Sequence, residues 1–146
     1  MMRLILLLLT LPAGAVPLRW TTTFEKTGHC QYSVPPQWRG ASDAHAVPLM
    51  YAPGGAATVE QTWSSVSGWS VYAGHMRQVF KPAVVHEDTP HRLWLEYPAD
   101  WPGVHYYVAV PSAGGACVAM VDLRPQPNAE LREVLREVID TMRAVY

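Results

Sequence analysis

The chain has 146 residues and a formal net charge of −1 at pH 7. This length leaves room for one domain, and the 49% of hydrophobic residues is enough for a packed core. The net charge is close to neutral, and the sequence contains no run of Lys or Arg. This excludes the basic surface that binding to nucleic acids or anionic membranes requires. We therefore expect no nucleic-acid partner.

The first residues have the pattern of a secretory signal peptide, 1–15. Arg3 gives a basic start, Leu4 to Leu11 is an almost purely aliphatic run, and Ala13-Gly14-Ala15 supplies the small residues that signal peptidase requires. We predict cleavage after Ala15, a periplasmic or secreted location, and no stable membrane insertion afterwards. The alternatives are a buried helix or a retained anchor, but the run is shorter than the roughly 20 residues that a spanning helix needs.

The segment 28–34 is predicted as the first strand of a single domain, 28–146. It follows a lead-in over 16–27 that includes a candidate edge strand near Trp20–Phe24. Cys30, Tyr32 and Val34 alternate with polar residues, so one face is apolar, and the two prolines that follow end the strand.

The two cysteines allow only one intramolecular pairing, Cys30 with Cys117. Disulfides persist in oxidising compartments, so export predicts this bond. A bond there would tie the first strand to the last strand before the final helix. The alternative is two buried free thiols.

The middle of the chain changes from strands to a helix. A loop over 40–45 precedes a predicted hairpin of Val47–Tyr51 and Ala57–Trp63, closed by a turn at 53–55. The helical period then starts at Trp69 and ends before Lys81-Pro82, with Ser67 or Ser70 as the candidate N-cap. Its expected buried face consists of Trp69, Tyr72, Met76, Val79 and Phe80.

Three more strands are predicted over 93–97, 104–110 and 116–123, joined as successive antiparallel hairpins. The last of them is apolar on both faces, which is typical of an interior strand covered from both sides.

An amphipathic helix of about sixteen residues closes the chain. Asn128 is its predicted N-cap, and Arg136–Asp140 and Asp140–Arg143 are predicted ion pairs. Its apolar stripe is Leu131, Val134, Leu135, Val138, Ile139 and Met142. These elements predict an α+β fold, with an antiparallel sheet of about six strands flanked by the internal helix and the C-terminal helix.

This order of elements resembles the PsbP-like superfamily, small α/β/α sandwich domains that include periplasmic bacterial domains and a photosystem II extrinsic subunit. Three segments carry the resemblance: Tyr32–Trp38, the strand series 93–123, and Ile139–Arg143 at the end of the last helix. The resemblance implies a bacterial α/β/α sandwich that serves as a binding, assembly or accessory domain. It implies no catalytic residues, and the cysteine pair is not part of its pattern.

Histidines are the first candidates for chemistry. His86 and His91 lie five residues apart with Pro90 between them, which rules out the helical His-Glu-x-x-His zinc motif. A loop metal site that adds His105 is a weak candidate, and the alternative is a solvated turn between strands.

No other catalytic pattern is complete. The segment 68–72 starts like a nucleophile elbow but lacks the closing glycine, and the glycine pairs are turn glycines rather than a phosphate loop. We expect no cofactor, and the sequence favours a protein that is not an enzyme.

Aromatic residues give the candidate binding patch. Trp94, Tyr107 and Trp101 are predicted to project together beside His105 and Glu96, and Trp101 in its turn is expected to stay exposed. The alternative is that a helix or the lead-in covers this face.

These observations predict an exported, non-enzymatic binding or accessory domain, stabilised by one disulfide, whose partner is a protein, peptide or glycan. Two alternatives remain. One is a small metal-dependent or hydrolytic enzyme that uses the His86–His105 region, and the other is a carrier with a small ligand between the sheet and the Trp69–Phe80 helix.

Overall fold

The computed structural model describes residues 19–42 and 48–146, so the predicted signal peptide and part of the predicted loop over 40–45 lie outside the described residues. The strands are β1 (Thr21–Phe24), β2 (Cys30–Val34), β3 (Arg39–Ser42), β4 (Pro48–Tyr51), β5 (Ala57–Ser65), β6 (Val84–Asp88), β7 (Leu93–Glu96), β8 (Val104–Ser112), β9 (Gly115–Leu123) and β10 (Arg143–Ala144). The helices are α1 (Trp69–Phe80) and α2 (Ala129–Asp140), and the 3-10 turn η1 (Pro53–Gly55) joins β4 to β5.

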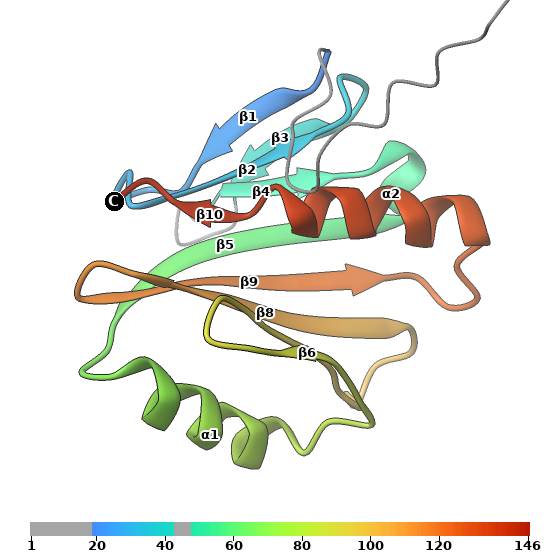
Figure 1. Cartoon of the computed structure of the whole chain (residues 1–146). Coiled ribbons are helices and arrows are strands. Elements are labelled where there is room, and N and C mark those ends of the chain that lie inside the picture. The colour runs from blue at the N-terminus through green and yellow to red at the C-terminus, as the bar shows by residue number, and fades with distance from the viewer. Residues whose placement is uncertain (1–18, 43–47) are drawn as a thin grey trace, which may run out of the picture.

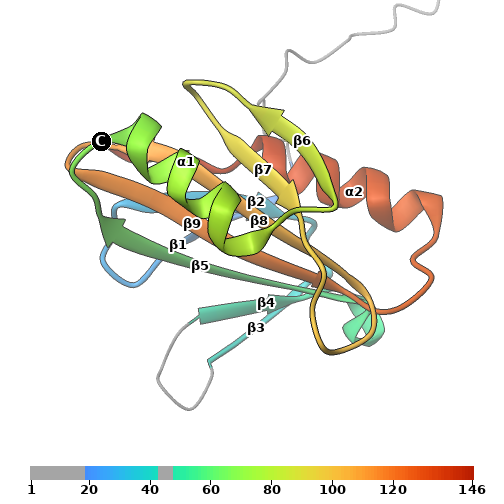
Figure 2. The same ribbon diagram turned by 90° about the horizontal axis from the view of Figure 1, so that it is seen from below.

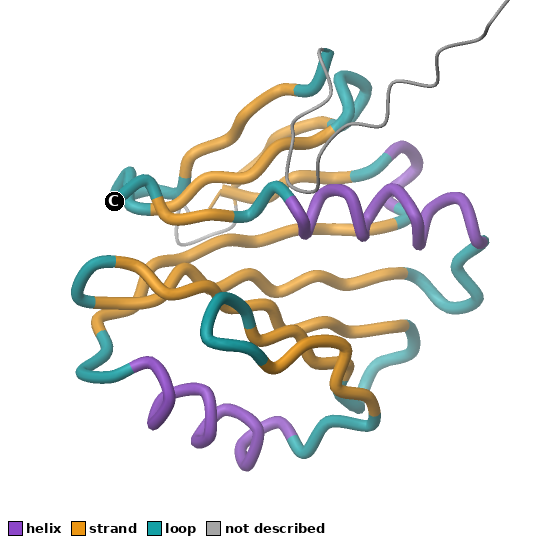
Figure 3. Tube along the Cα trace, viewed as in Figure 1, coloured by secondary structure: helices purple, strands orange, loops and turns teal. Residues whose placement is uncertain are grey.

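These elements form three layers (Figures 1 and 2). The middle layer is an antiparallel sheet with strand order β3-β4-β5-β9-β8-β7-β6. α1 covers one face of this sheet, and α2 lies on the other face beside a second, smaller sheet with order β1-β2-β10. Figure 3 shows the two helices on opposite sides of the strands. The predicted α+β class and its α/β/α layering are confirmed.

The middle sheet is buried on both faces. On the α2 side, Val59 and Val121 are fully buried with Leu135 of α2. On the α1 side, Leu95 and Tyr107 are buried beneath the helix. β9 lies between β5 and β8 at the centre of this sheet, which is the position that its two apolar faces predict.

The middle sheet has more strands than expected, because two edge strands were not predicted. β3 occupies part of the predicted loop, and β6 occupies the segment around His86, where a turn was predicted. An edge strand needs hydrogen bonds from only one neighbour and no buried face. Because β6 is mostly exposed, its sequence lacks the alternation by which the other strands were found.

β2 does not join the middle sheet. It pairs with β1 on one side, where Thr23 lies opposite Tyr32, and with β10 on the other, where Ala144 lies opposite Cys30. The segment predicted as a lead-in therefore supplies an edge strand of the domain.

α1 has the predicted bounds, but its predicted cap is wrong. Gly68 is the N-cap residue and no side chain caps the helix. Lys81 ends the helix in the left-handed region (φ 45°), with its N–H donating to Arg77 O. Val79 was predicted on the buried face but is 55% exposed.

α2 begins as predicted, since Leu131 N–H donates to Asn128 Oδ1 at 2.8 Å. It ends at Asp140, after twelve residues rather than about sixteen. The buried Thr141 hydroxyl follows the helix and bonds to Val138 O and to the backbone of Ser33 in β2. The chain then turns into β10, so the helix is shortened by a contact with a distant strand.

Both predicted ion pairs of Asp140 are wrong. Asp140 accepts instead from the Arg92 guanidinium at 2.9 Å, and the same guanidinium donates to Glu87 at 2.9 Å. The positive charge of this half-buried arginine also interacts favourably with the partial negative charge at the C-terminal end of α2. Arg92 thus connects the turn between β6 and β7 to α2.

The Cys30–Cys117 disulfide is present, with a Cα–Cα distance of 5.6 Å. It joins the first strand of the predicted domain to the last strand before the final helix, as expected, and these strands, β2 and β9, belong to the small sheet and the middle sheet. Both cysteines are buried, at 0% and 2% exposure. The bond therefore fixes the small sheet onto the centre of the large one.

No helix within residues 19–42 and 48–146 has the length and apolar character to cross a membrane.

Removing the disulfide should strongly destabilise the fold. The bond spans a sequence separation of 87, for which the chain-entropy model gives a stabilisation of about 4.5 kcal/mol. We expect the double variant Cys30→Ala, Cys117→Ala to lose roughly this much in urea unfolding followed by circular dichroism. Thiol labelling of the unreduced, denatured wild type should find no free thiol, and two reactive thiols would contradict the bond.

Candidate functional site

The connection from β7 to β8, residues 97–103, presents an exposed tryptophan. Trp101 is 55% exposed. Gly103 has a φ of 127°, which L side chains rarely adopt, and a Cβ there would lie 2.2 Å from Leu123 O. The turn therefore packs its backbone directly against the end of β9, and only glycine fits at this contact.

His105 lies under this turn and holds its backbone. The ring is 2% exposed, with Nε2 at 3.0 Å from Trp101 O and Nδ1 at 2.6 Å from Asp122 Oδ1. A carbonyl and a carboxylate only accept, so both bonds form together when the ring carries a proton on each nitrogen. The Trp101 ring contacts the His105 ring edge-on, with centroids 4.9 Å apart. His105 thus holds Trp101 in two places, by a hydrogen bond to its backbone carbonyl and by a contact with its indole ring.

Tyr97 completes the group around His105, with ring centroids 5.9 Å apart. Burial, and then the negative charge of Asp122, raise the pKa of Tyr97 to about 12. The phenol therefore remains protonated at any physiological pH, so Tyr97 serves this site as a neutral aromatic wall.

The four residues predicted as one binding patch do not lie on one surface. Trp94 is opposite Val108 and faces α2, whereas Tyr107 is opposite Leu95 and faces α1. Both are buried, and the Tyr107 hydroxyl bonds to the hydroxyl of Tyr72. The register between β7 and β8, which the sequence does not reveal, places these two rings on opposite faces. Trp101 and His105 remain together.

Of the two histidines proposed as weak metal ligands, one has side-chain partners and the other is exposed. His86 Nε2 lies 3.0 Å from Glu96 Oε2, and the His86 ring stacks on Trp94 at 4.5 Å. His91 is exposed in the turn after β6. The described part of the chain contains no group of three or more His, Cys, Asp or Glu residues placed to hold a metal ion.

The region between α1 and the sheet was the predicted place for a carried ligand, and it is a packed core. Phe80 contacts both Tyr97 and Tyr107, with centroids 4.7 and 4.4 Å apart. A pocket of about 240 Å³ lies beside α1 between Trp69 and Asp88, and another of about 290 Å³ lies between Ser65 and His75. The contacts of Phe80 with both tyrosines therefore argue against a carried ligand at this position between α1 and the sheet.

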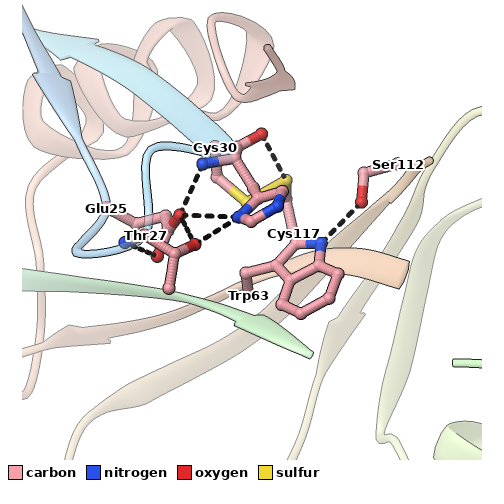
Figure 4. Close-up of a disulfide and its surroundings, with 7 residues drawn as sticks. Glu25, Thr27, Cys30, Trp63, Ser112 and Cys117 are labelled. Atoms are coloured by element: carbon pink, nitrogen blue, oxygen red, sulfur yellow. Dashed lines mark hydrogen bonds and ion pairs between the residues drawn. A yellow bond between two sulfur atoms is a disulfide. The ribbon is translucent and has the colours of Figure 1, made fainter. Parts of the chain in front are cut away.

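A polar cluster surrounds the disulfide (Figure 4). Glu25 is 5% exposed and accepts from Thr27 N at 2.8 Å, from the Thr27 hydroxyl and from His29 N at 2.7 Å. Burial alone would raise its pKa. The bonds from Thr27 and His29, together with the nearby His29 ring, outweigh burial and hold the pKa of Glu25 below its ordinary value.

Aromatic rings extend this cluster to the C-terminus. His29 stacks on Trp63 with centroids 4.4 Å apart, and it meets Tyr146 edge-on at 5.6 Å. The Trp63 indole donates to the Ser112 hydroxyl at 2.8 Å. The β1–β2 turn, the end of β5 and the C-terminus are therefore joined around Cys30 and Cys117.

Sequence reasoning missed the buried polar residues Glu25 and Gln61, as well as Ser33 and Thr141. Glu25 carried no periodic signal, because it lies in a turn whose contacts are local. Gln61 did leave a signal in the sequence. It falls in the alternating series Ala57, Val59 and Trp63, so a polar side chain lies on the inward, apolar face of the strand.

These features define a small α/β/α sandwich with a disulfide between its layers and an aromatic turn at one end. The chain is similar to cyanobacterial PsbP (CyanoP) from Synechocystis sp. PCC 6803, solved in solution, with a TM-score of 0.58 and 10% identity over 93% of this chain and 98% of that one. The predicted PsbP-like fold is confirmed; at this identity the similarity concerns the fold alone. No protein-family model matches the sequence, and no curated protein matches it.

A side chain at Gly103 should destabilise the turn that carries Trp101. We expect Gly103→Ala to be destabilised by about 2 kcal/mol or more, because the new Cβ meets the Leu123 carbonyl and the backbone is left-handed. Chemical denaturation measures the loss, and Gly28→Ala, which meets no atom within 4 Å at a φ of 79°, is the control for backbone strain alone. Equal losses in both variants would contradict the packing argument.

Stability should fall in acid through Glu25. Because its folded pKa lies below the value of 4.5 for a free side chain, its contribution is full above that value and is lost as the pH falls through the folded pKa. We expect Glu25→Gln to be less stable at pH 7 and to show a shallower loss of stability in acid. Parallel pH profiles of unfolding free energy for the two proteins would contradict this.

Proposed function

We propose that this chain is an exported, non-enzymatic accessory domain that binds a protein partner through the surface around Trp101. The observation that carries the proposal is an indole with 55% exposure on a turn whose backbone is held from below. Aromatic anchors of this kind dominate binding energy at protein interfaces.

The fixed backbone matters as much as the exposure. A side chain that is already positioned loses less conformational entropy on binding. His105 bonds to Trp101 O, and Gly103 packs on Leu123 O, so the turn is positioned before any partner arrives. This arrangement favours a role in recognition.

Export is supported by the disulfide and by the N-terminal pattern, since such bonds persist outside reducing compartments. The absence of enzymatic activity is supported by the use of the histidines. His105 spends both ring nitrogens on protein acceptors and His86 bonds to Glu96, which leaves them in structural roles. Members of the PsbP-like superfamily, which the sequence resembles, serve as binding or accessory domains.

The test begins with a partner captured through the proposed surface. A photo-crosslinking residue at Asp100, beside Trp101, is expected to capture a protein from the native envelope fraction that the same residue at the exposed Gln78 of α1 does not capture. Failure to capture any protein reproducibly, or equal capture from both positions, would contradict the proposal.

Affinity for the purified partner then separates Trp101 from general stickiness. Trp101→Ala is expected to weaken binding roughly 30-fold, the effect of a hot-spot residue worth about 2 kcal/mol. Phe24→Ala is the matched control, because Phe24 is 54% exposed on β1, and its affinity should equal that of the wild type. Wild-type affinity in Trp101→Ala would overturn the assignment.

A further inference from the structure

Gln61 is a buried amide with an unused acceptor. It lies opposite Ala119 in the middle sheet and is 3% exposed. Within the described residues, its Oε1 has no hydrogen-bond partner. Buried polar atoms in folded proteins are nearly always paired, so an unpaired one calls for a missing donor.

The donor has a place to sit. Gln61 lines a pocket of about 180 Å³, together with Glu25, Pro48 and Trp63. One water molecule needs roughly 10–15 Å³ of such space, so the pocket has room for more than a single water. The exposed Lys26 and Thr27 also line it and give it an opening to solvent. The remaining lining residue is Thr62.

The chemistry of the walls selects the occupant. The buried wall offers the Gln61 amide oxygen and the Glu25 carboxylate, both of which accept, beside the apolar Pro48 and Trp63. Lys26, a cationic lining residue, is exposed at the opening. The carboxylate already receives bonds from Thr27 and His29, but two oxygens have room for more than three donors. A positive donor group fits this buried pair, whereas an anion would meet the Glu25 carboxylate and could pair with Lys26 and Thr27 only at the opening.

We infer that this pocket binds a small primary ammonium compound, whose ammonium donates to Gln61 Oε1 and lies beside Glu25, and whose carbon chain lies against Pro48 and Trp63. An ammonium has three donors and no acceptor, which matches the buried Gln61 and Glu25 acceptors of this site. The site is separate from the Trp101 surface and does not depend on the proposed function.

The test uses the full chain with its disulfide intact and three small probe compounds of similar size that differ in charge. Propylammonium, propan-1-ol and propionate are titrated while NMR follows the Gln61 side-chain amide and the Trp63 indole. Propylammonium is expected to give saturable shifts at both groups, and propionate none. Propan-1-ol is expected to bind at least tenfold more weakly, and equal binding of the alcohol would overturn the requirement for charge.

Variants locate the effect. Gln61→Met keeps the size of the side chain but removes the acceptor, and it is expected to weaken propylammonium binding at least tenfold. Gln78→Met, on the exposed face of α1, is the control and should bind as the wild type does.

A measurement on the wild type alone covers the case in which Gln61→Met does not fold. Water contacts to the Gln61 amide, seen as NMR cross-peaks, are expected to disappear as propylammonium is added. Water that stays in place, with no saturable shift at Gln61, would show an ordinary buried water and overturn the inference.

Discussion

The burial of β9 on both faces is the constraint on which the other layers depend. An apolar sheet face must be covered, and one helix of twelve residues is about 18 Å long. α1 covers the side that carries Leu95 and Tyr107. On the other side, α2 covers only part of the sheet, and the small sheet of β1, β2 and β10 lies beside it.

Three long-range contacts attach this composite cover. The disulfide links β2 to β9, the Thr141 hydroxyl bonds to the backbone of Ser33, and Arg92 holds Asp140 at the end of α2. Each joins segments that are far apart in sequence, so each constrains the chain strongly once made. The small sheet has little core of its own, and its position therefore depends on these links and on the apolar residues that it shares with the middle sheet.

Local sequence patterns correctly predicted the elements whose structure depends mainly on nearby residues. The bounds of α1, the Asn128 cap and the central place of β9 followed from period, capping chemistry and two-sided apolarity. The pairing of Cys30 with Cys117 followed from there being no other cysteine. What could not be predicted depends on distant partners: the end of α2 is set by Ser33, and the face of Tyr107 is set by the register with β7. β6 is mostly exposed. It therefore has no buried face, and its sequence lacks the apolar alternation that would identify a strand.

The same contrast separates the two buried polar residues that matter for binding. His105 and Gln61 both lie on strands of the middle sheet, and both are nearly inaccessible to solvent. His105 has an acceptor at each ring nitrogen, so its polar atoms are used to position the Trp101 turn. Gln61 has an acceptor left over beside a pocket.

The register also keeps these sites apart. Val104, which follows the Trp101 turn, lies opposite Leu123, and Leu123 lies opposite Ala57, whereas Gln61 is four residues further along β5. At about 3.4 Å per residue this is roughly 14 Å along the strand. A ligand at Gln61, in the middle of β5, and a protein at Trp101, in the turn before β8, would thus occupy separate places on one sheet. A fully paired polar residue supports the surface, and an incompletely paired one forms the site.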